Sequence, residues 1–310
     1  MNQPKITIIM ATFNRAHFIV ETLHSIQNQT FMNWECLIID DDGTDNTIEV
    51  IAPILEKNNR FKFIKRSNKH LKGLPGCRNF GLDLAKGEYV IFFDDDDIIH
   101  PNNLATCLEV FETNNVDFCH YQKMSFVGQK PPINTKPIVI KQFLTIEDLE
   151  KVVTQEIGLA SCTIMWKKYC FDYCHFNEYL LYAEEWECYS RLMMEDFKGV
   201  IIDNVLYYNR KHPNSNTGEY YRNNPIRTDS KKKAIRLISD NLDCKNLLTP
   251  NLLKYMASLA IGFRDTKLLN DIFAISKVSN YNKLFLQIKY WLFPIWKIYK
   301  RIGKKIKPNK

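Results

Sequence analysis

Short apolar segments alternate with helical patterns over the first hundred residues, and this alternation is the feature that most restricts the fold. The predicted strands are 6–11, 36–39, 61–65 and 89–93, and the helical patterns between them are 16–27, 45–57 and 75–85. Strands and helices that alternate in this way predict a mostly parallel sheet with helices on both faces. The third helix is expected to end at Lys86-Gly87, a plausible C-cap.

The pattern is less regular after residue 115. Segments 117–124, 159–166 and 200–209 are predicted strands, and 183–195 is a predicted helix. The polar, proline-containing segment 127–139 is predicted to be an exposed loop. From residue 230 onward the pattern is helical and rich in lysine, so a helical C-terminal region is expected to follow the sheet.

Polar residues follow three of the four early strands. The letters "TFNR" come after the first strand, "DDDGTD" after the second and "DDDD" after the fourth. The carboxyl ends of parallel strands meet at one edge of a sheet, and ligands bind there in open α/β folds. The sequence therefore predicts a binding site at this edge.

Four consecutive carboxylates, residues 94–97, end the fourth strand. Adjacent ionised carboxylates repel each other and need positive charge nearby. Asp94 and Asp96 share one face of an extended segment, and hard oxygen ligands suit Mg²⁺ or Mn²⁺. Asp97 alone has a simpler interpretation, the opening of a helix near Pro101. We expect a divalent-cation site at the end of this strand.

Several motifs in fixed order resemble a known family. They are "ATFNRAHFIVETLHSIQNQTFMNWECLIIDDDGTDNT", "GCRNFGLDLAKGEYVIFFDDDDIIHP", "AEEWECYSRL" and "LYYNRKH", within residues 4–217. Together they resemble family 2 inverting glycosyltransferases of the bacterial polysaccharide or O-antigen type. The resemblance implies the GT-A fold, an α/β fold with a Rossmann-like, mostly parallel sheet. It also implies a catalytic domain over 1–220, with a nucleotide-binding half (1–100) and an acceptor half (101–220), followed by a helical, basic region over 221–310.

The resemblance implies a nucleotide-sugar pocket formed by the loops after the early strands. Phe13 would stack on uracil, although a buried core phenylalanine is the alternative, and Asp41 would bind the base edge. Asp42 adds an acid that the family motif lacks, and Asp45 is expected to cap the next helix. The implied nucleotide-sugar contacts are Ala11, Thr12, Phe13, Asn14, Asp41, Arg78, Asp94 and Asp95.

The resemblance also implies the catalytic groups. Asp96 would ligate Mn²⁺ or Mg²⁺, with His212 as a second ligand or as a surface residue. Glu185 would be the base that takes a proton from the acceptor hydroxyl. Glu184 would bind the acceptor, and Arg191 would pair with one of the two glutamates. A solvated helix start is the alternative for this glutamate pair.

Charge is unevenly distributed along the chain. The net charge is +7, and residues 272–310 contain ten Lys or Arg and no acid. The remainder is thus about −3, which does not fit a nucleic-acid-binding protein with a uniformly basic surface. Aromatic and basic residues of the tail, 280–307, suit a helix at an anionic membrane surface, or a helix packed on the protein. Its longest uncharged stretch, 290–296, is far shorter than the ~20 residues of a membrane span.

Nine cysteines and an N-terminus without a signal-peptide pattern predict a reducing cytoplasm. Localisation at the inner face of the cytoplasmic membrane would fit the tail. Cys170, Cys174 and His175 lack the second pair that zinc sites need, so buried thiols are expected.

The resemblance implies transfer of a sugar from a nucleotide-diphosphate donor, expected to be a UDP-sugar, to a hydroxyl of a saccharide or lipid-linked saccharide. One alternative is a non-catalytic membrane-attached assembly protein on the same fold. Another is a phosphotransferase with an aspartate nucleophile, but that class carries its aspartates near the first strand.

Overall fold

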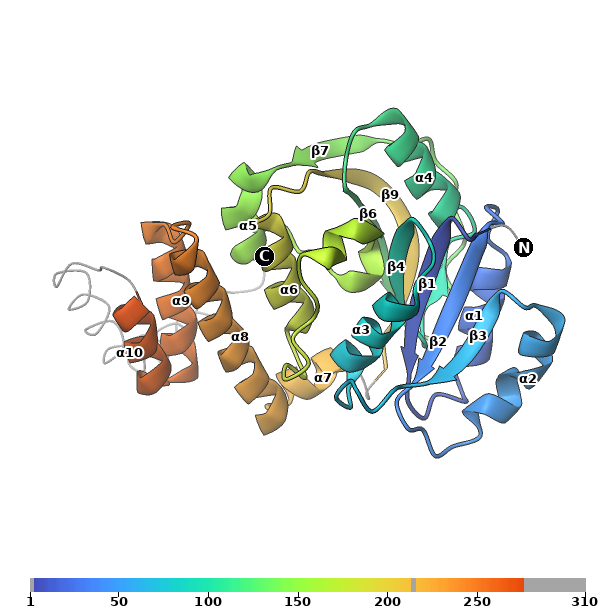
Figure 1. The fold of residues 1–310 in the computed structure, drawn as a ribbon, viewed down its shortest axis with the longest axis horizontal. Coiled ribbons are helices and arrows are strands. Elements are labelled where there is room, and N and C mark those ends of the chain that lie inside the picture. The colour runs from blue at the N-terminus through green and yellow to red at the C-terminus, as the bar shows by residue number, and fades with distance from the viewer. Residues whose placement is uncertain (1–2, 213–215, 276–310) are drawn as a thin grey trace, which may run out of the picture. The chain divides into compact units, whose positions relative to one another are not determined.

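The computed structural model describes residues 3–212 and 216–275, and the chain divides into two compact units, residues 1–231 and 232–310. The first unit contains the sheet, and the second is helical (Figure 1). The division falls later than the boundary expected at residue 220.

Four parallel strands form the N-terminal half of the sheet. They are β1 (Ile6–Thr12), β2 (Trp34–Asp40), β3 (Phe61–Lys65) and β4 (Tyr89–Asp94), in the order β3-β2-β1-β4. Thr12 pairs in register with Asp40, Asp40 with Lys65, and Ala11 with Asp94. The predicted polar segments therefore begin at the same edge of the sheet.

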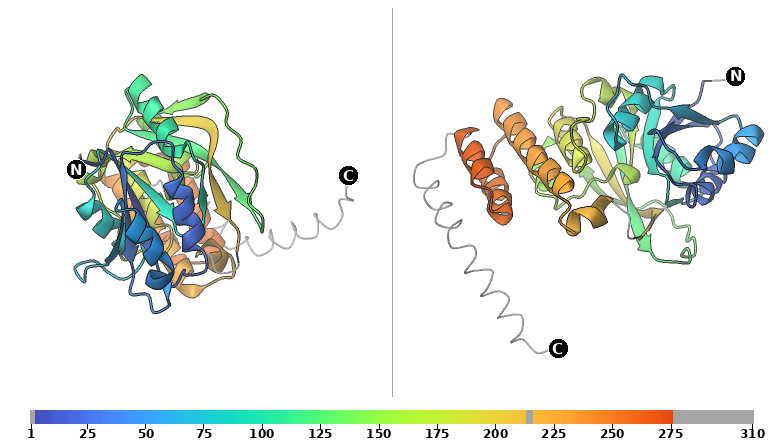
Figure 2. Two further views of the ribbon diagram at one scale, coloured as in Figure 1. Left: turned by 90° about the vertical axis from the view of Figure 1, so that its right-hand side faces the viewer. Right: turned by 90° about the horizontal axis from the view of Figure 1, so that it is seen from below.

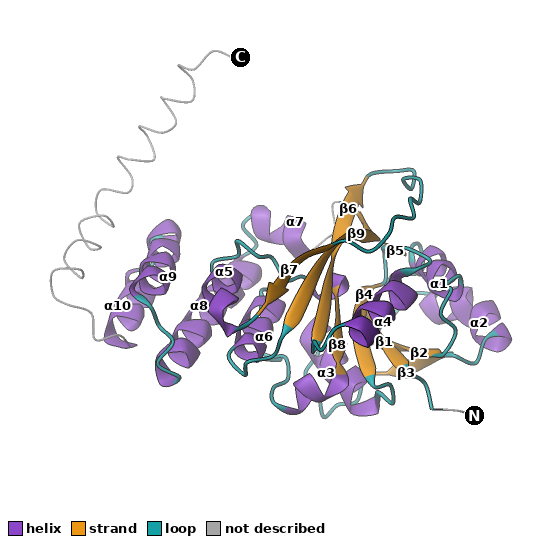
Figure 3. Cartoon of the chain, turned by 90° about the horizontal axis from the view of Figure 1, so that it is seen from above, coloured by secondary structure: helices purple, strands orange, loops and turns teal. Residues whose placement is uncertain are grey.

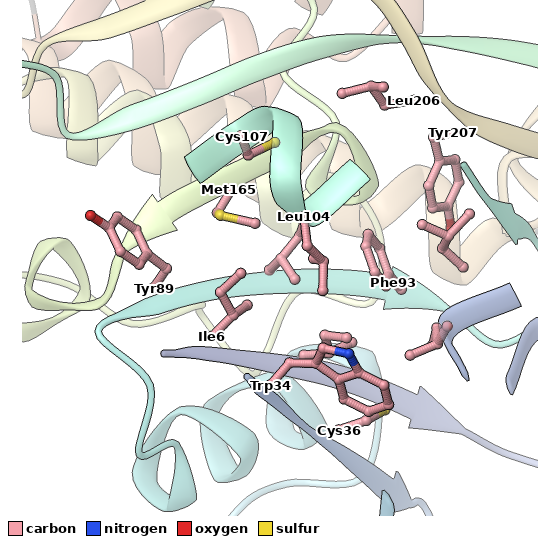
Figure 4. Close-up of a cluster of buried hydrophobic side chains, with 14 of the residues drawn as sticks. Ile6, Trp34, Cys36, Tyr89, Phe93, Leu104, Cys107, Met165, Leu206 and Tyr207 are labelled. Carbon is pink, nitrogen blue, oxygen red and sulfur yellow. The ribbon is translucent and has the colours of Figure 1, made fainter. Parts of the chain in front are cut away.

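Helices cover both faces of this half, which explains why its strands read as continuous apolar runs. Cys36 and Ile38 of β2 belong to a core shared with α1 (Ile19–Gln27), α2 (Thr47–Lys57) and α4 (Asn103–Thr113). Leu37 and Ile39 alternate with them and pack with Cys77 of α3 (Leu74–Leu84). Figure 4 shows the larger core, where Leu104 of α4 lies beside side chains of the sheet.

The C-terminal half of the sheet is mixed in direction. The sheet continues from β4 in the order β8-β6-β9-β5, with β7 also paired to β9, and only β6 and β9 are parallel. Helices lie on both sides of the strands (Figure 3). The remaining elements of this part are β5 (Ile98–Ile99), β6 (Phe118–Phe126), β7 (Ile140–Leu144), η1 (Ile146–Asp148), α5 (Leu149–Val153), η2 (Ser161–Thr163), β8 (Ile164–Lys167), η3 (Lys168–Asp172), α6 (Glu184–Met193), β9 (Gly199–Arg210) and α7 (Asn216–Tyr221).

Two local predictions differ from the structure. The strand expected over 159–166 begins only at Ile164, as β8, because residues 161–163 form the 3₁₀ turn η2, in which the Thr163 hydroxyl donates to the Ala160 carbonyl. Gly87 is not a left-handed helix cap, since α3 already ends at Ala85 in an extended conformation. A Cβ at position 87 would lie 2.5 Å from the Thr7 nitrogen, so glycine allows the backbone before β4 to approach β1 closely.

The second unit includes most of α8 (Pro225–Cys244), with α9 (Pro250–Phe263) and α10 (Thr266–Ile275). The helices α9 and α10 pack against each other (Figure 2). Thr249 caps α9 by accepting from the Leu252 amide at 3.1 Å, and Lys232 pairs with Asp265 at 2.7 Å. Among the described helices, none is long and apolar enough to cross a membrane. The expected interfacial segment, 280–307, lies outside the described residues.

Candidate active site

Asn14 joins the loops that follow β1 and β2. Its side-chain oxygen accepts from the amides of Thr44 and Asp45, at 2.7 and 3.2 Å. Asp45 accepts from the amides of Ala16 and Thr47, at 3.1 and 3.0 Å, so it supports the start of α2. These hydrogen bonds connect the two loops through Asn14. Together the loops form one wall of the candidate site.

Phe13 is exposed on this wall, and the alternative of a buried core residue is wrong. Its side chain is 45% exposed, and the Lys72 ammonium lies 4.6 Å from the ring centroid. The preceding residues differ, because Thr12 is buried in β1 and Ala11 is half-buried. An exposed aromatic ring beside a cation provides a face on which a flat base can stack.

Asp41 is held by an arginine that the sequence analysis did not select. Arg66 Nε donates to Asp41 at 2.6 Å, and Arg66 Nη2 donates to Asp42 at 2.8 Å. The extra acid, Asp42, adopts a left-handed conformation with φ 62° and also pairs with Lys65 at 3.0 Å. The turn thus accommodates the departure from the family motif. Arg66 follows directly after β3, so its place at the binding edge was the signal that could have found it.

His70 connects this loop to the segment before α6. The Arg66 guanidinium donates to the His70 carbonyl at 2.6 Å. The imidazole Nδ1 lies 2.7 Å from Glu178, and Nε2 lies 2.9 Å from Asp83. Glu178 also accepts from the Leu71 amide at 2.6 Å. An imidazole between two carboxylates can donate to both only when it is protonated.

Replacing His70 with glutamine should destabilise the protein in a pH-dependent way. Burial alone would lower the pKa of His70. The hydrogen bonds to Glu178 and Asp83 together have the larger effect in the opposite direction, so the pKa of His70 lies above its usual value. The stabilisation should therefore be complete below pH 6.5, about 1.5–3 kcal/mol for a hydrogen bond to a charged group, and should decline as pH rises through the raised pKa. Denaturant unfolding between pH 6 and 9 measures this difference.

The exposed His24→Gln variant is the control for the His70 prediction. Its free energy of unfolding should follow that of the wild type at every pH. A wild-type minus His70→Gln difference that stays constant from pH 6 to 9 would contradict the proposed protonated imidazole.

The four strand-end carboxylates occupy different environments. Asp97 is fully buried and accepts from the Asn209 side chain and the Arg210 amide, at 3.0 and 2.7 Å, so it attaches β9 to the loop. Asp95 is buried, with Arg15 3.4 Å away. Burial and the neighbouring acids raise the pKa of Asp95 to about 8 and that of Asp97 to about 7. A cation nearby would stabilise the ionised form of these buried, mutually repelling carboxylates.

Asp96 and His212 form the candidate metal pair. His212 Nε2 lies 2.9 Å from an Asp96 carboxylate oxygen, and Arg15 Nη2 lies 3.8 Å from that oxygen. Among the described residues no group of three or more His, Cys, Asp or Glu side chains could hold a metal ion. Mg²⁺ and similar ions are nevertheless held by one or two protein ligands with the phosphates of a substrate. The Asp96–His212 pair and the raised pKa values beside it fit such an ion.

Arg78 and Glu184 form a buried ion pair. Arg78 Nη1 donates to Glu184 at 2.9 Å, both residues are less than a tenth exposed, and Arg78 Nη2 lies 3.9 Å from Asp94. Burial lowers the pKa of Arg78, while Glu184, Glu185 and Asp94 raise it, with a net increase. Arg78 therefore connects the strand-end acids with α6, and a direct contact with the nucleotide stays a prediction.

Glu185 is held by a residue that the sequence analysis missed. One carboxylate oxygen, Oε2, accepts from the Ser161 amide at 2.9 Å and from the Ser161 hydroxyl at 2.6 Å. Ala183, which precedes the pair of glutamates, adopts a left-handed conformation with φ 64°. This conformation is costly for alanine, and such strain often occurs at functional sites. It turns the chain into α6 so that both glutamates begin the helix.

The expected pairing of Arg191 with Glu184 or Glu185 was wrong. Arg191 donates instead to Glu187, at 2.6 and 2.8 Å, and to the His175 carbonyl. Glu187 lies one helical turn before Arg191, within reach of its side chain, whereas the two expected partners lie almost two turns away. Arg191 thus supports the helix.

Strand-end acids, an exposed aromatic ring and a pair of glutamates thus lie on an α/β sheet, and solved glycosyltransferases have the same fold. Staphylococcus aureus TarS residues 1–349 in complex with UDP-GlcNAc matches with a TM-score of 0.63 at 20% identity, over 93% of this chain and 81% of TarS. The mannosyltransferase PcManGT of Pyrobaculum calidifontis, solved with GDP-Man and Mn²⁺, matches with a TM-score of 0.58 at 14% identity, over 98% and 84%.

The profile of glycosyl transferase family 2 matches residues 7–169, and the chain belongs to this family. An uncharacterized glycosyltransferase of Rickettsia conorii is 35% identical over 42% of this chain, but the match spans only 21% of that protein. An Escherichia coli protein named as a UDP-Glc:α-D-GlcNAc-diphosphoundecaprenol β-1,3-glucosyltransferase is 28% identical over 59% of this chain and 70% of its own length. A Campylobacter jejuni GalNAc(5)-diNAcBac-PP-undecaprenol β-1,3-glucosyltransferase is 37% identical over 34% of each protein.

Proposed function

We propose that this protein transfers a sugar from a UDP-sugar to a hydroxyl of a lipid-linked saccharide, with inversion and with the help of Mn²⁺ or Mg²⁺. The observation that supports the proposal is the position of Asp94, whose carboxylate interacts both with Asp96, the partner of His212, and with Glu185. The names of the E. coli and C. jejuni relatives, both acting on undecaprenol-linked sugars, support the acceptor class. The TarS complex with UDP-GlcNAc supports the donor class.

The residues of the candidate site would have separate tasks in this mechanism. Phe13 would stack on the base and Asp41 would bind its edge, while Asp94 and Asp95 would face the ribose. A divalent ion held by Asp96 and His212 would neutralise the charge that develops on the departing diphosphate. Glu185 would take the proton of the acceptor hydroxyl through its second oxygen, Oε1, as that hydroxyl attacks the anomeric carbon from the far side.

A panel of sugar nucleotides tests the proposal. The purified chain of residues 1–310 is incubated with UDP-glucose, UDP-GlcNAc, UDP-galactose and GDP-mannose, each with Mn²⁺ or EDTA and with an undecaprenyl-diphosphate saccharide as acceptor. Release of UDP that requires both the metal and one donor is expected. A chain that binds UDP but releases none from any donor would support the alternative of a non-catalytic assembly protein.

In the His212→Asn variant, UDP binding in the presence of Mn²⁺ should be about tenfold weaker. Losses of this size follow removal of a residue that helps to hold a metal ion. Isothermal titration with UDP, with and without Mn²⁺, measures the effect. The exposed His24→Asn variant, on α1, should bind like the wild type. If His212→Asn has the same Mn²⁺ dependence as the wild type, the metal role of His212 is excluded.

The acceptor class places the reaction at a membrane surface, and we propose that the protein works peripherally on the inner face of the cytoplasmic membrane. Lysine-rich composition of residues 280–307 supports this proposal. Co-sedimentation with vesicles containing anionic lipid, compared for the full chain and a chain ending at residue 275, would test it.

A further inference from the structure

We infer that Ser161 is a positioning residue for the catalytic base, fixing Glu185 so that only one of its carboxylate oxygens is free to take the acceptor proton. The inference rests on the proposed function, because it takes Glu185 as the base. Ser161 lies on η2, which precedes β8, and its side chain is 2% exposed. The residue is far from Glu185 in sequence and meets it only through the fold.

Ser161 directs both of its donors at a single atom. The backbone amide and the hydroxyl lie 2.9 and 2.6 Å from Glu185 Oε2. In the described part of the chain, no hydrogen bond is recorded to Oε1. Two donors saturate Oε2 and restrict rotation of the carboxylate, which leaves Oε1 as the proton acceptor.

The turn that carries Ser161 is itself rigid. The Tyr121 hydroxyl donates to the Cys162 carbonyl at 2.8 Å, and His120 Nδ1 donates to the Thr163 carbonyl at 3.1 Å. Both partners come from β6, so the two residues that follow Ser161 in η2 are attached to the sheet. A rigid donor can hold a carboxylate with the precision that proton transfer requires.

Several charged groups face Glu185 from neighbouring elements. They are Arg78 on α3, Asp94 on β4, Lys123 on β6 and Lys231 on α8. A substitution at Ser161 leaves all four in place. The buried Tyr189 of α6 also neighbours Ser161 and Glu185, so the loss of rate is assigned to the Glu185 contact by combining the Ser161 variant with a Glu185 variant.

The Ser161→Ala variant removes the hydroxyl and keeps the amide. We expect kcat for UDP release from the preferred donor to fall about tenfold, which corresponds to about 1.4 kcal/mol, while KM for the donor is unchanged. Ser161→Cys, which keeps the size but donates weakly, should fall between Ser161→Ala and the wild type. Both variants should bind UDP with Mn²⁺ like the wild type.

Thr163→Val is the matched control, since it removes a buried hydroxyl of the same turn that donates to the Ala160 carbonyl at 2.8 Å. It should keep the wild-type kcat and the wild-type KM for the donor. The decisive comparison adds Ser161→Ala to Glu185→Gln, where no further loss of rate is expected. A kcat of Ser161→Ala equal to that of Thr163→Val, or an equal loss in both backgrounds, would overturn the inference. If Glu185→Gln itself retains the full rate, the proposed base is wrong instead.

Discussion

Replacing Glu185 with glutamine should lower the rate of sugar transfer by about a hundredfold or more, the usual contribution of a positioned general base. The amide keeps the size of the side chain and can still accept from Ser161, so the protein should fold and bind UDP with Mn²⁺ unchanged. Initial rates of UDP release with saturating acceptor measure the effect. The loss should appear in kcat and not in KM for the donor.

The exposed Glu49→Gln variant on α2 is the control for this substitution. This variant carries the same chemical change outside the candidate active site, and it should transfer sugar at the wild-type rate. Transfer by Glu185→Gln within twofold of the wild type would remove Glu185 from the role of base, even if metal-dependent UDP binding is found.

Replacing Arg78 with methionine should lower the free energy of unfolding by about 3–5 kcal/mol, the cost of leaving one member of a buried ion pair alone. Glu184 is 7% exposed, and Arg78 is its ion-pair partner at 2.9 Å. Burial raises the pKa of Glu184, and the Arg78 guanidinium lowers it. Removing the guanidinium should therefore favour protonation of Glu184. Chemical denaturation at pH 7 measures the change, independently of any activity.

Adding Glu184→Gln to Arg78→Met should recover most of the lost stability, because the double variant leaves no unpaired charge. The exposed Arg222→Met variant, in contrast, should change stability by less than about 0.5 kcal/mol. Equal losses in the single and double variants would mean that Arg78 stabilises the protein through packing on Phe92 and Phe176, not through its charge.

Local patterns in the chain were sufficient for the parallel half of the sheet. Buried strands with helices on both faces leave a continuous apolar run, and the polar residues that follow each run must then lie at one edge. The strands β1 to β4 and the positions of Asp41 and Asp94 were predicted on this basis. The segment 159–166 was harder to predict, because an apolar run of that length is compatible with both the turn η2 and the strand β8.

The sequence by itself determined the family motifs, the binding edge and the residue types available for catalysis. Only the tertiary structure decided which side chains of the site contact each other. The pairs are Asp41 with Arg66, Arg78 with Glu184, and Ser161 with Glu185. Periodicity reports which face of an element is buried, because that depends on neighbours three or four residues away. Partners separated by twenty to a hundred residues are set by how strands and helices pack, and no local pattern records that choice.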